Sequence, residues 1–418
     1  AWAMEGDDAP ANGAEPISGD VLSYDLGDSY VQADGEPPQT GQGLAFKYFD
    51  GLPTSGDRAT IRAINFEGEL AWEKQLSDRS QITTATDSAG HIYAAWNRPA
   101  KPWMIGKFDA NGDLLWEKEL EQNNHTVESM VVNGDTIYTA GTGGSSGLIY
   151  SINAVDGSIN WTETQSNPIS GLNDILTDGD ALYVVGRAAG NPPNPWGDSH
   201  SHSHAYKYDF DGNQIWESKW HPKTTPNHVS RSRWATEYSA IVFENQLISV
   251  GTAYVNNPDT DWLNYPVSRD LETGEILWHK QLRDIDNTWK SGLNHDIVSH
   301  NGFAYIISNN GSQTTIFEME KDGSLGRQLT LDSTHANNFV VANNELHLFG
   351  RTSLNTGVAE NQGGDDLFLA KIDSGFDNAV VPFSGISIIP TAPRDSEGNL
   401  QTSEDGSSTS FKVKLNQA

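Results

Sequence analysis

Cysteine is absent from this chain of 418 residues. Its absence excludes thiol nucleophiles, zinc–thiolate sites and iron–sulfur clusters. Small secreted domains depend on disulfides, whereas a chain of this length can bury enough apolar surface without them. Long apolar runs are also absent, and none approaches the ~18 residues that a membrane-spanning helix needs. We therefore expect no direct membrane insertion.

Positive charge is scarce in this sequence. Lys and Arg together number 26 against 56 Asp and Glu, which gives a formal net charge of −30. Such a field repels nucleic acids and anionic membranes and attracts cations. We therefore expect no nucleic-acid partner. The acidity suits an extracellular, cell-surface or periplasmic location, and it makes Ca²⁺ a candidate ligand.

The first residues differ from the rest in composition. Residues 1–19 are acidic, small and proline-containing, which is typical of a flexible lead-in. Ala1-Trp2-Ala3 fits the small-x-small pattern that ends a secretory signal peptide, and a cloning remnant before Met4 fits equally well.

One unit is repeated along the chain. Five segments each contain an alternating apolar run, a turn rich in Asp, Gly, Asn or Thr, and a second run that closes on a tryptophan, which is the pattern of a β-hairpin. These tryptophans are Trp72, Trp116, Trp161, Trp216 and Trp278. They are 44 (116−72), 45 (161−116), 55 (216−161) and 62 (278−216) residues apart, and a second hairpin precedes each of them. A period in the forties predicts four-stranded propeller blades.

We therefore predict an all-β fold, a seven-bladed β-propeller of four-stranded antiparallel blades over residues 20–390. Residues 20–26 or 385–390 would complete the irregular first blade, whose other strands we place at 45–76. The two longer spacings between tryptophans predict blades with loop insertions.

The DxxGxxxW hairpins resemble the repeats of PQQ-like propellers. Residues 350–373, GRTSLNTGVAENQGGDDLFLAKID, resemble the bacterial β-propeller repeat called SBBP. This resemblance covers roughly residues 45–385 and implies a propeller, but the fold hosts many functions. No residues match the cofactor-binding set of quinoprotein dehydrogenases, so we expect no PQQ. Thr402–Ala418 resembles the opening strands of a Calx-β-like module, so residues 391–418 would be a linker and the start of such a module, with further domains of the polypeptide as partners, or a tail strand.

Tryptophans also gather in the long loops that we place on one face of the propeller. Aromatic rings there could stack on the apolar faces of sugars, which predicts a glycan or cell-surface ligand. Alternatively, each ring could fill a groove between blades. The five residues are Trp103, Trp196, Trp234, Trp262 and Trp289.

The aligned inner strands predict polar pairs at the mouth of a central channel. The carboxylates of Glu128, Asp174 and Asp296, with Glu237, could hold a cation such as Ca²⁺. His295 and His335 could act as bases beside it. The alternative is a hydrated channel lining. The pairs are Thr83-Thr84, Glu128-Ser129, Asn173-Asp174, Tyr238-Ser239, His295-Asp296 and Asn337-Asn338.

Three histidines alternate in the sequence DSHSHSHAYKYD, residues 198–209. Aligned with the other repeats, the stretch is the third strand of the fourth blade, so His200, His202 and His204 share one face. Two or three of them could bind Zn²⁺, Cu²⁺ or Ni²⁺ with Asp198, or with His221 or His228 from the next loop. An ordinary strand explains the alternation without any metal.

Three functions fit these features. The first is a non-catalytic ligand-binding propeller of a secreted or surface protein. The second is a polysaccharide lyase acting on a uronic-acid polymer, with a base and cationic side chains on the loop face. Its candidate residues are His228, Arg231, Arg233, Tyr238 and His295. The third is a metal-holding scaffold.

Overall fold

A computed structural model represents the protein. It describes residues 30–31, 44–48, 59–64, 70–77, 82–87, 89–98, 101–120, 125–144, 146–165, 169–188, 202–220, 234–255, 261–282, 296–310, 313–332, 334–342, 345–352 and 366–372. No helix in these ranges is long and apolar enough to cross a membrane.

The described strands form seven antiparallel sheets, in which consecutive strands are hydrogen-bonded neighbours. We number the sheets in chain order. The first contains β1 (Tyr30–Val31), β2 (Leu44–Tyr48), β3 (Ala59–Ile64) and β4 (Leu70–Ser77). The second contains β5 (Ile82–Thr86), β6 (Ile92–Arg98), β7 (Lys101–Phe108) and β8 (Leu114–Glu119). The third contains β9 (His125–Asn133), β10 (Thr136–Gly143), β11 (Ser146–Asn153) and β12 (Ile159–Gln165).

The remaining sheets repeat this order. The fourth contains β13 (Ile169–Thr177), β14 (Leu182–Ala188), β15 (His202–Tyr208) and β16 (Gln214–Trp220). The fifth contains β17 (Trp234–Phe243), β18 (Gln246–Val255), β19 (Asp261–Asp270) and β20 (Ile276–His279). The sixth contains β21 (Ile297–His300), β22 (Phe303–Asn310), β23 (Gln313–Met319) and β24 (Leu325–Asp332). The seventh has three described strands, β25 (Thr334–Ala342), β26 (Glu345–Thr352) and β27 (Asp366–Ile372).

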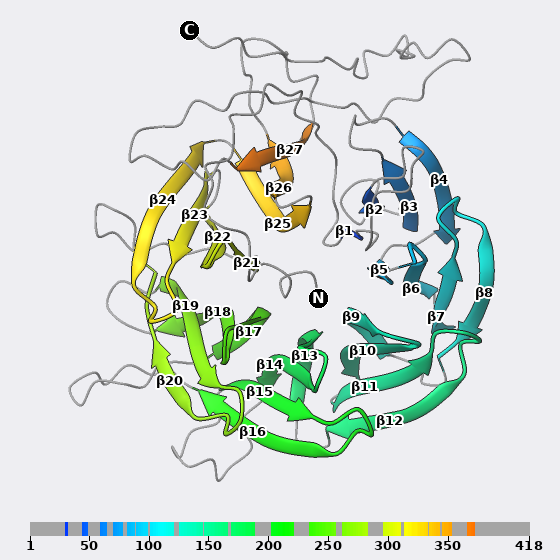
Figure 1. The fold of residues 1–418 in the computed structure, drawn as a ribbon, viewed down its shortest axis with the longest axis horizontal. Helices are drawn as coiled ribbons and strands as arrows, with labels where there is room; N and C mark the ends of the chain where they lie inside the picture. The colour runs from blue at the N-terminus through cyan, green and yellow to red at the C-terminus, as the bar shows by residue number, and fades with distance from the viewer. Residues whose placement is uncertain are drawn as a thin grey trace, which may run out of the picture.

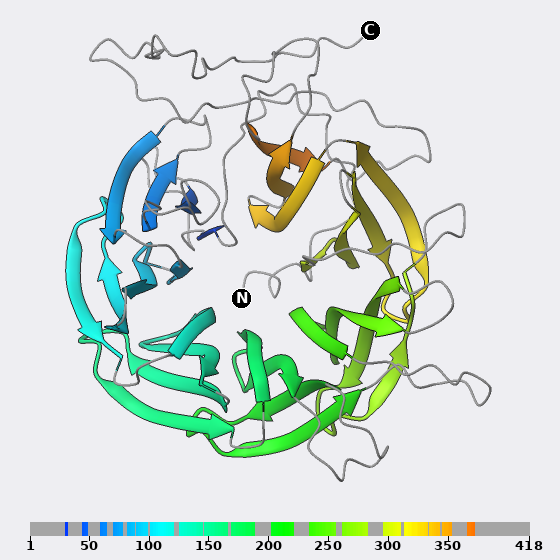
Figure 2. The same cartoon turned by 180° about the vertical axis from the view of Figure 1, so that it is seen from behind.

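The sheets follow one another around a ring, with the first strand of each sheet nearest its centre and the last strand outermost (Figures 1 and 2). This confirms the predicted all-β propeller of four-stranded blades. The blade count of seven stays a prediction, because the seventh sheet has three described strands. The strand that pairs inside β2 is Tyr30–Val31, with Tyr30 opposite Phe46. Both segments that we expected to supply it, 20–26 and 385–390, lie outside the described residues, as do 1–19 and 391–418.

The five repeated tryptophans join neighbouring sheets. Each indole N–H donates to a backbone carbonyl in the outer hairpin turn of the next sheet, at 2.9–3.2 Å. In each of these turns a glycine with φ of 71–89° lies against the ring, and a Cβ there would come within 2.8–3.1 Å of a ring atom. Other residues rarely adopt such a φ. In each repeat the outer turn therefore accepts the indole of the preceding sheet, and the tryptophan donates to the turn of the following sheet. The two features recur together because every sheet takes part in both junctions.

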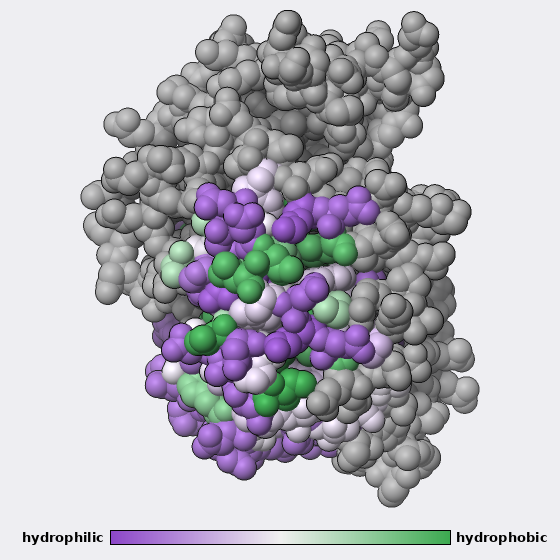
Figure 3. Space-filling view, turned by 90° about the vertical axis from the view of Figure 1, so that its right-hand side faces the viewer, coloured by the Kyte–Doolittle hydropathy of each residue, from purple (hydrophilic) through white to green (hydrophobic). Residues whose placement is uncertain are grey.

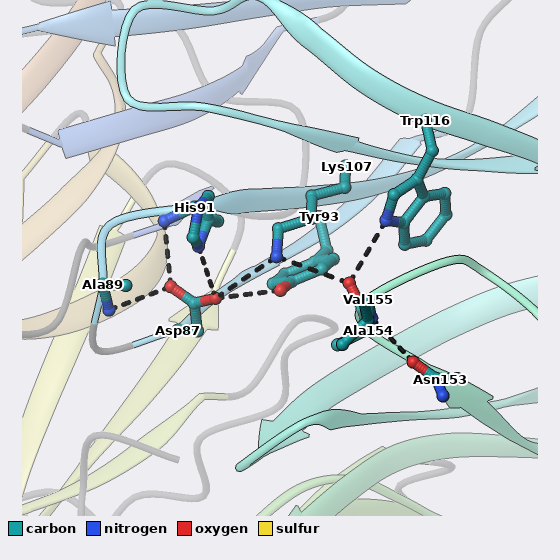
Figure 4. Close-up of polar contacts among 9 residues, drawn as sticks. All are labelled: Asp87, Ala89, His91, Tyr93, Lys107, Trp116, Asn153, Ala154 and Val155. Atoms are coloured by element: carbon teal, nitrogen blue, oxygen red, sulfur yellow. Dashed lines mark hydrogen bonds and ion pairs between the residues drawn. The ribbon is translucent and has the colours of Figure 1, made fainter.

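A further polar link accompanies the tryptophan at the junction of the second and third sheets (Figure 4). Tyr93 donates its hydroxyl hydrogen to Asp87 at 2.8 Å, and the Lys107 ammonium lies 5.1 Å from the Tyr93 ring centroid. Lys107 Nζ and the Trp116 indole donate to the same carbonyl oxygen, that of Ala154, at 3.4 and 3.2 Å. We call this Asp–Tyr–Lys–Trp set the clamp.

The fourth sheet contains a second clamp. Tyr183 donates to Asp178 at 2.7 Å, and Lys207 and Trp216 both donate to the Leu271 carbonyl at 3.0 Å. Lys207 also lies 5.5 Å from the Tyr183 ring centroid. The recurrence two blades later shows that the clamp is a feature of the repeat.

The apolar core lies between the sheets. One cluster joins Val131, Tyr138 and Ile149 of the third sheet to Val184 and Tyr206 of the fourth, and clusters of the same kind lie between the other consecutive sheets from the first to the seventh. On the outer side seen in Figure 3, hydrophobic side chains form separate areas divided by hydrophilic ones. Isolated exposed aliphatic residues of this kind are ordinary on soluble proteins.

Candidate functional site: the bulges of the inner strands

Inner strands of the third, fourth and fifth sheets each contain a β-bulge, at the fourth residue of β9 and at the fifth residue of β13 and of β17. The paired register skips Glu128 in β9, Asn173 in β13 and Tyr238 in β17. A bulge adds one residue to a strand and redirects its side chain. Glu128 is exposed, and Asn173 and Tyr238 are half-buried. We call these three residues the bulge ring. In the seventh sheet Asn337 has the same register position.

Glycines on the second strands make room for these bulges. A Cβ on Gly141, Gly186 or Gly251 would lie 1.8, 2.3 or 1.9 Å from a carbonyl oxygen of the neighbouring inner strand. A backbone oxygen at that distance leaves no space for any side chain. The glycine that ends runs such as TIYTAG and ALYVVG is therefore the sequence signal for a bulge.

The second sheet has no such glycine, and Trp96 occupies the position. Its inner strand pairs in unbroken register, with Thr83 opposite Ala95. Thr83 is thus equivalent to Ser129, which lies opposite Ala140. Our alignment placed Thr84 there, which is wrong by one residue, because the other inner strands gain a residue at the bulge.

Two carboxylates beside the bulge ring link consecutive sheets. Asp174 accepts hydrogen bonds from the Ser129 hydroxyl of the third sheet at 2.7 Å and from the Ala240 amide of the fifth at 2.9 Å. Asp296, immediately before β21, accepts one from the Ser239 hydroxyl at 3.0 Å.

The Phe339 amide of the seventh sheet also donates to Asp296, at 2.7 Å. Each carboxylate therefore ties together three neighbouring sheets. Cation binding by these two residues stays a prediction.

Burial controls the protonation of both carboxylates. It raises the pKa of Asp296 to about 6, against the hydrogen bonds from Phe339 and Ser239, and the negative charge of Asp174 acts in the same direction as burial. Burial likewise raises the pKa of Asp174, while its bonds to Ser129 and Ala240 oppose the rise. A carboxylate in a poorly hydrated place costs free energy when it ionises. Among the described residues, no group of three His, Asp or Glu side chains could hold a metal ion.

Glu237 does not belong to a cation site. It is 1% exposed, and its carboxylate is paired with Arg269, which is 0% exposed, at 2.6 and 3.1 Å. Arg269 also donates to Ser218 and Ser249, at 3.1 and 2.9 Å. The residue next to the bulge thus points into the sheet interior, and this buried pair could not be found from local sequence. Thr236 of the same strand accepts a hydrogen bond from Asn173 at 3.0 Å.

The predicted tryptophan platforms have different outcomes. Trp103 lies in β7, is 4% exposed and packs in a core cluster, so its prediction as an exposed platform is wrong: the third strand begins earlier than we expected and carries the ring into the core. Trp234 is the first residue of β17 and Trp262 the second residue of β19, and each pairs in register with Tyr254 of β18. Trp196 and Trp289 lie outside the described residues.

The histidine stretch is the third strand of the fourth sheet, as predicted. His202 and His204 are 3% and 4% exposed because β15 is buried along its whole length. His204 Nδ1 lies 2.9 Å from the Tyr206 hydroxyl and 3.2 Å from the Glu217 carboxylate. Burial lowers the pKa of His204 although Glu217 opposes this. The predicted metal site is not found among the described residues, and His200 lies outside them.

Of the five candidate lyase residues, Tyr238 lies in the bulge ring, where its hydroxyl is 3.5 Å from the Thr252 hydroxyl. Four of the five lie outside the described residues: His228, Arg231, Arg233 and His295. The same holds for His221 and Asp198, the predicted partners of the histidine stretch in a metal site. His335 belongs to β25, opposite Arg351.

Comparison with known proteins gives one family and several partial likenesses. The sequence pattern of the family described as "Outer membrane protein assembly factor BamB" matches residues 104–351, more than half of the chain. Lambda-carrageenases of Pseudoalteromonas sp and Pseudoalteromonas carrageenovora are each 33% identical over 86 residues, 19% of this chain. The chain spans only 9% of the length of these relatives.

Solved structures resemble the chain in fold. The β-propeller domain of the Trilobed protease from Pyrococcus furiosus matches with a TM-score of 0.51 at 12% identity, over 86% of this chain and 98% of that one. Quinohemoprotein alcohol dehydrogenase from Comamonas testosteroni has a TM-score of 0.48 at 12% identity, over 86% of this chain and 69% of that one.

Proposed function

The chain belongs to the β-propeller repeat family described as outer membrane protein assembly factor BamB, and on that premise we propose that it is a non-catalytic propeller that binds a glycan outside the cytoplasm. The binding surface is the first half of the inner strands, which holds the bulge ring, with the tryptophan-bearing loops beside it. One observation carries the proposal: three sheets use the same glycine-permitted bulge to place Glu128, Asn173 and Tyr238 at one level of the ring.

The chemistry of the bulge ring suits a sugar without negative charge. The Glu128 carboxylate can accept and the Tyr238 phenol can donate hydrogen bonds to hydroxyl groups, which is how polar side chains orient a ligand. The amide hydrogens of Asn173 go to Thr236 and to the Glu237 carbonyl, which leaves its oxygen as an acceptor. The formal net charge of the chain is −30. This field disfavours anionic polymers and favours neutral or amino-bearing glycans.

Aromatic residues support the same surface. Trp234, Tyr254 and Trp262 lie in register across the fifth sheet, and Trp234 precedes Tyr238 by four residues (238−234) in β17. Aromatic faces pack well on the apolar faces of sugar rings. The likeness to lambda-carrageenases, proteins named for a polysaccharide-degrading activity, is consistent with a carbohydrate ligand although it covers 9% of their length.

A glycan array tests this proposal. We expect binding to neutral or amino-bearing glycans, weaker binding to sulfated and uronate glycans, and loss of binding in Trp262→Ala. Incubation of uronate polymers with the protein should give no rise in ultraviolet absorbance from unsaturated uronides. A panel without any bound glycan, or binding that Trp262→Ala leaves unchanged, would contradict the proposal. An absorbance rise would favour the lyase instead.

A further inference from the structure

Hydroxyl groups beside the bulge ring direct their hydrogens to the protein. The Ser129 hydroxyl donates to Asp174 at 2.7 Å, and the Ser239 hydroxyl donates to Asp296 at 3.0 Å. The Thr83 hydroxyl donates to a backbone carbonyl of β9 at 2.8 Å. A hydroxyl has a single hydrogen, so each of these three groups can offer only its oxygen to a ligand.

Asn173 is restricted in the same way. Its side-chain nitrogen donates to the Thr236 hydroxyl at 3.0 Å and to the Glu237 carbonyl at 2.5 Å, and these two bonds use both of its hydrogens. The backbone carbonyl fixes which end of the amide is which, because a carbonyl cannot donate. A ligand at the bulge ring therefore meets the Asn173 oxygen, which can only accept.

Glu128 adds a carboxylate next to this oxygen. It is exposed in the third sheet, and a carboxylate accepts hydrogen bonds and donates none. Its bulge lies beside that of Asn173, because the residues that follow them, Ser129 and Asp174, are hydrogen-bonded across the two sheets. Two neighbouring members of the bulge ring are therefore acceptors, and one of them is an acid.

A protonated amine matches these acceptors better than the other groups that sugars carry. An ammonium group donates up to three hydrogen bonds and accepts none. A hydroxyl or an N-acetyl group also has an oxygen that needs a donor, and sulfate and carboxylate oxygens only accept. Hydrogen bonds between charged partners are stronger than those between neutral ones. The formal net charge of −30 also attracts a cationic group.

We propose that the bulge ring binds an amino sugar through its protonated amine, with Glu128 and the Asn173 oxygen as the acceptors. This rests on the glycan-binding function proposed for the same surface, and it narrows the ligand to glycans that contain glucosamine. Tyr238, the third member of the ring, lies in the next sheet, and its phenol can donate to a hydroxyl oxygen of the same glycan. The ring thus has acceptors in two sheets and a donor in the third.

Three hexasaccharides with the same backbone linkage test the preference for an amine. At the same carbon, the chitosan hexamer carries an amine, the chitin hexamer an N-acetyl group and cellohexaose a hydroxyl. Calorimetry at about 0.15 M salt, which screens charges more than about 8 Å apart, measures each dissociation constant. We expect the chitosan hexamer to bind at least about tenfold tighter than the other two, the equivalent of one hydrogen bond between charged groups.

Glu128→Gln is the decisive variant, and Asp135→Asn is its control. Both remove one exposed carboxylate from the third sheet, so they change the net charge equally. Glu128→Gln should reduce the preference for the chitosan hexamer to less than about twofold, because the amide brings donors and has no charge. Asp135→Asn should leave the preference unchanged. Circular dichroism establishes that both variants are folded.

The outcomes separate the amino sugar from the glycan site itself. A glycan array without any bound glycan contradicts both. If the array has a ligand but the chitosan hexamer binds no tighter than cellohexaose, the amino sugar alone is overturned. A preference that survives Glu128→Gln, or that Asp135→Asn removes equally, also overturns it, because general attraction to the acidic chain would then explain the preference.

A hexalysine peptide distinguishes an amino sugar from another source of amines. It should bind at least about tenfold more weakly than the chitosan hexamer, because it has no hydroxyl for Tyr238 and no sugar ring for the aromatic residues of the fifth sheet. If hexalysine binds as tightly as the chitosan hexamer, with the same loss in Glu128→Gln, the bulge ring recognises amines of any kind and the amino sugar is overturned.

Discussion

Replacement of His125 tests how much a buried, uncharged imidazole between two sheets costs the stability of the fold. The side chain is 1% exposed, lies 5.1 Å from the Tyr150 ring centroid and has both ring nitrogens without a hydrogen-bond partner among the described residues. Burial lowers its pKa from 6.5 to about 4. As pH falls, the unfolded chain takes up a proton near pH 6.5 and the folded protein only near pH 4, so stability is lost across this window. A difference of about 2.5 pKa units corresponds to about 3 kcal/mol.

Replacement of His125 by phenylalanine should therefore raise the free energy of unfolding, and raise it more in acid. At pH 7.5 the gain should be about 1–3 kcal/mol, because two unsatisfied nitrogens are removed. Between pH 6.5 and pH 5 the advantage over the unchanged protein should grow by about 2 kcal/mol. Urea unfolding at several pH values measures both quantities. All other titrating groups are common to the two proteins, so their difference isolates His125.

A second substitution serves as the control for this experiment. The pKa of Asp296 is raised to about 6, so its contribution has the opposite sign: stability increases as pH falls below 6. Asp296→Asn should remove that increase and leave the effect of His125 intact. If His125→Phe and the unchanged protein have parallel stability curves from pH 7.5 to pH 5, His125 is not a buried neutral group and the reasoning is refuted.

Three further substitutions test the packing of the repeat. Gly251→Ala would place a Cβ 1.9 Å from the Thr236 carbonyl oxygen, so thermal unfolding should show a loss of more than ~3 kcal/mol; a loss below ~1 kcal/mol would contradict the bulge geometry. Trp161→Phe keeps an aromatic side chain but removes the pyrrole part of the indole with its bond to Phe210, which should cost at least about 1 kcal/mol in urea unfolding, and no cost would mean that the bond is not formed. Glu237→Gln leaves a buried guanidinium without its charge partner and should cost about 3–5 kcal/mol, whereas a neutral effect would show that water reaches the pair.

Local turn chemistry made the fold readable from sequence. Asp-Gly hairpins and closing tryptophans recur because each turn must accept the indole of the preceding sheet, so one local constraint is repeated along the chain. The histidine stretch was placed in the correct strand for the same reason, since the outer hairpin that follows it has the repeated pattern. Alternation alone did not reveal that both faces of β15 are covered by neighbouring sheets.

Features that depend on contacts between sheets could not be predicted in this way. A bulge shifts the register by one residue, so the polar pairs of the inner strands could not be aligned without the glycine opposite. The proline before Trp103 predicts a loop, yet the ring packs in the core. The local sequence predicts Glu237 as a cation ligand, because its partner, Arg269, lies two strands later in the chain. Sequence periodicity predicts which side chains share a face of a strand, but it does not predict which residues of other strands pack on that face.

The central claim is that a glycan binds where the bulge ring lies. Its most direct test is the dissociation constant of the strongest array ligand, measured by calorimetry for Glu128→Gln and for Asp135→Asn. Both substitutions remove one exposed carboxylate from the third sheet, Glu128 from the bulge and Asp135 from the turn at the other end of the same strand. We predict at least about tenfold weaker binding for Glu128→Gln, the equivalent of one lost hydrogen bond to a charged group, and no change for Asp135→Asn. Equal affinities for the two variants, or a loss confined to Asp135→Asn, would contradict the account.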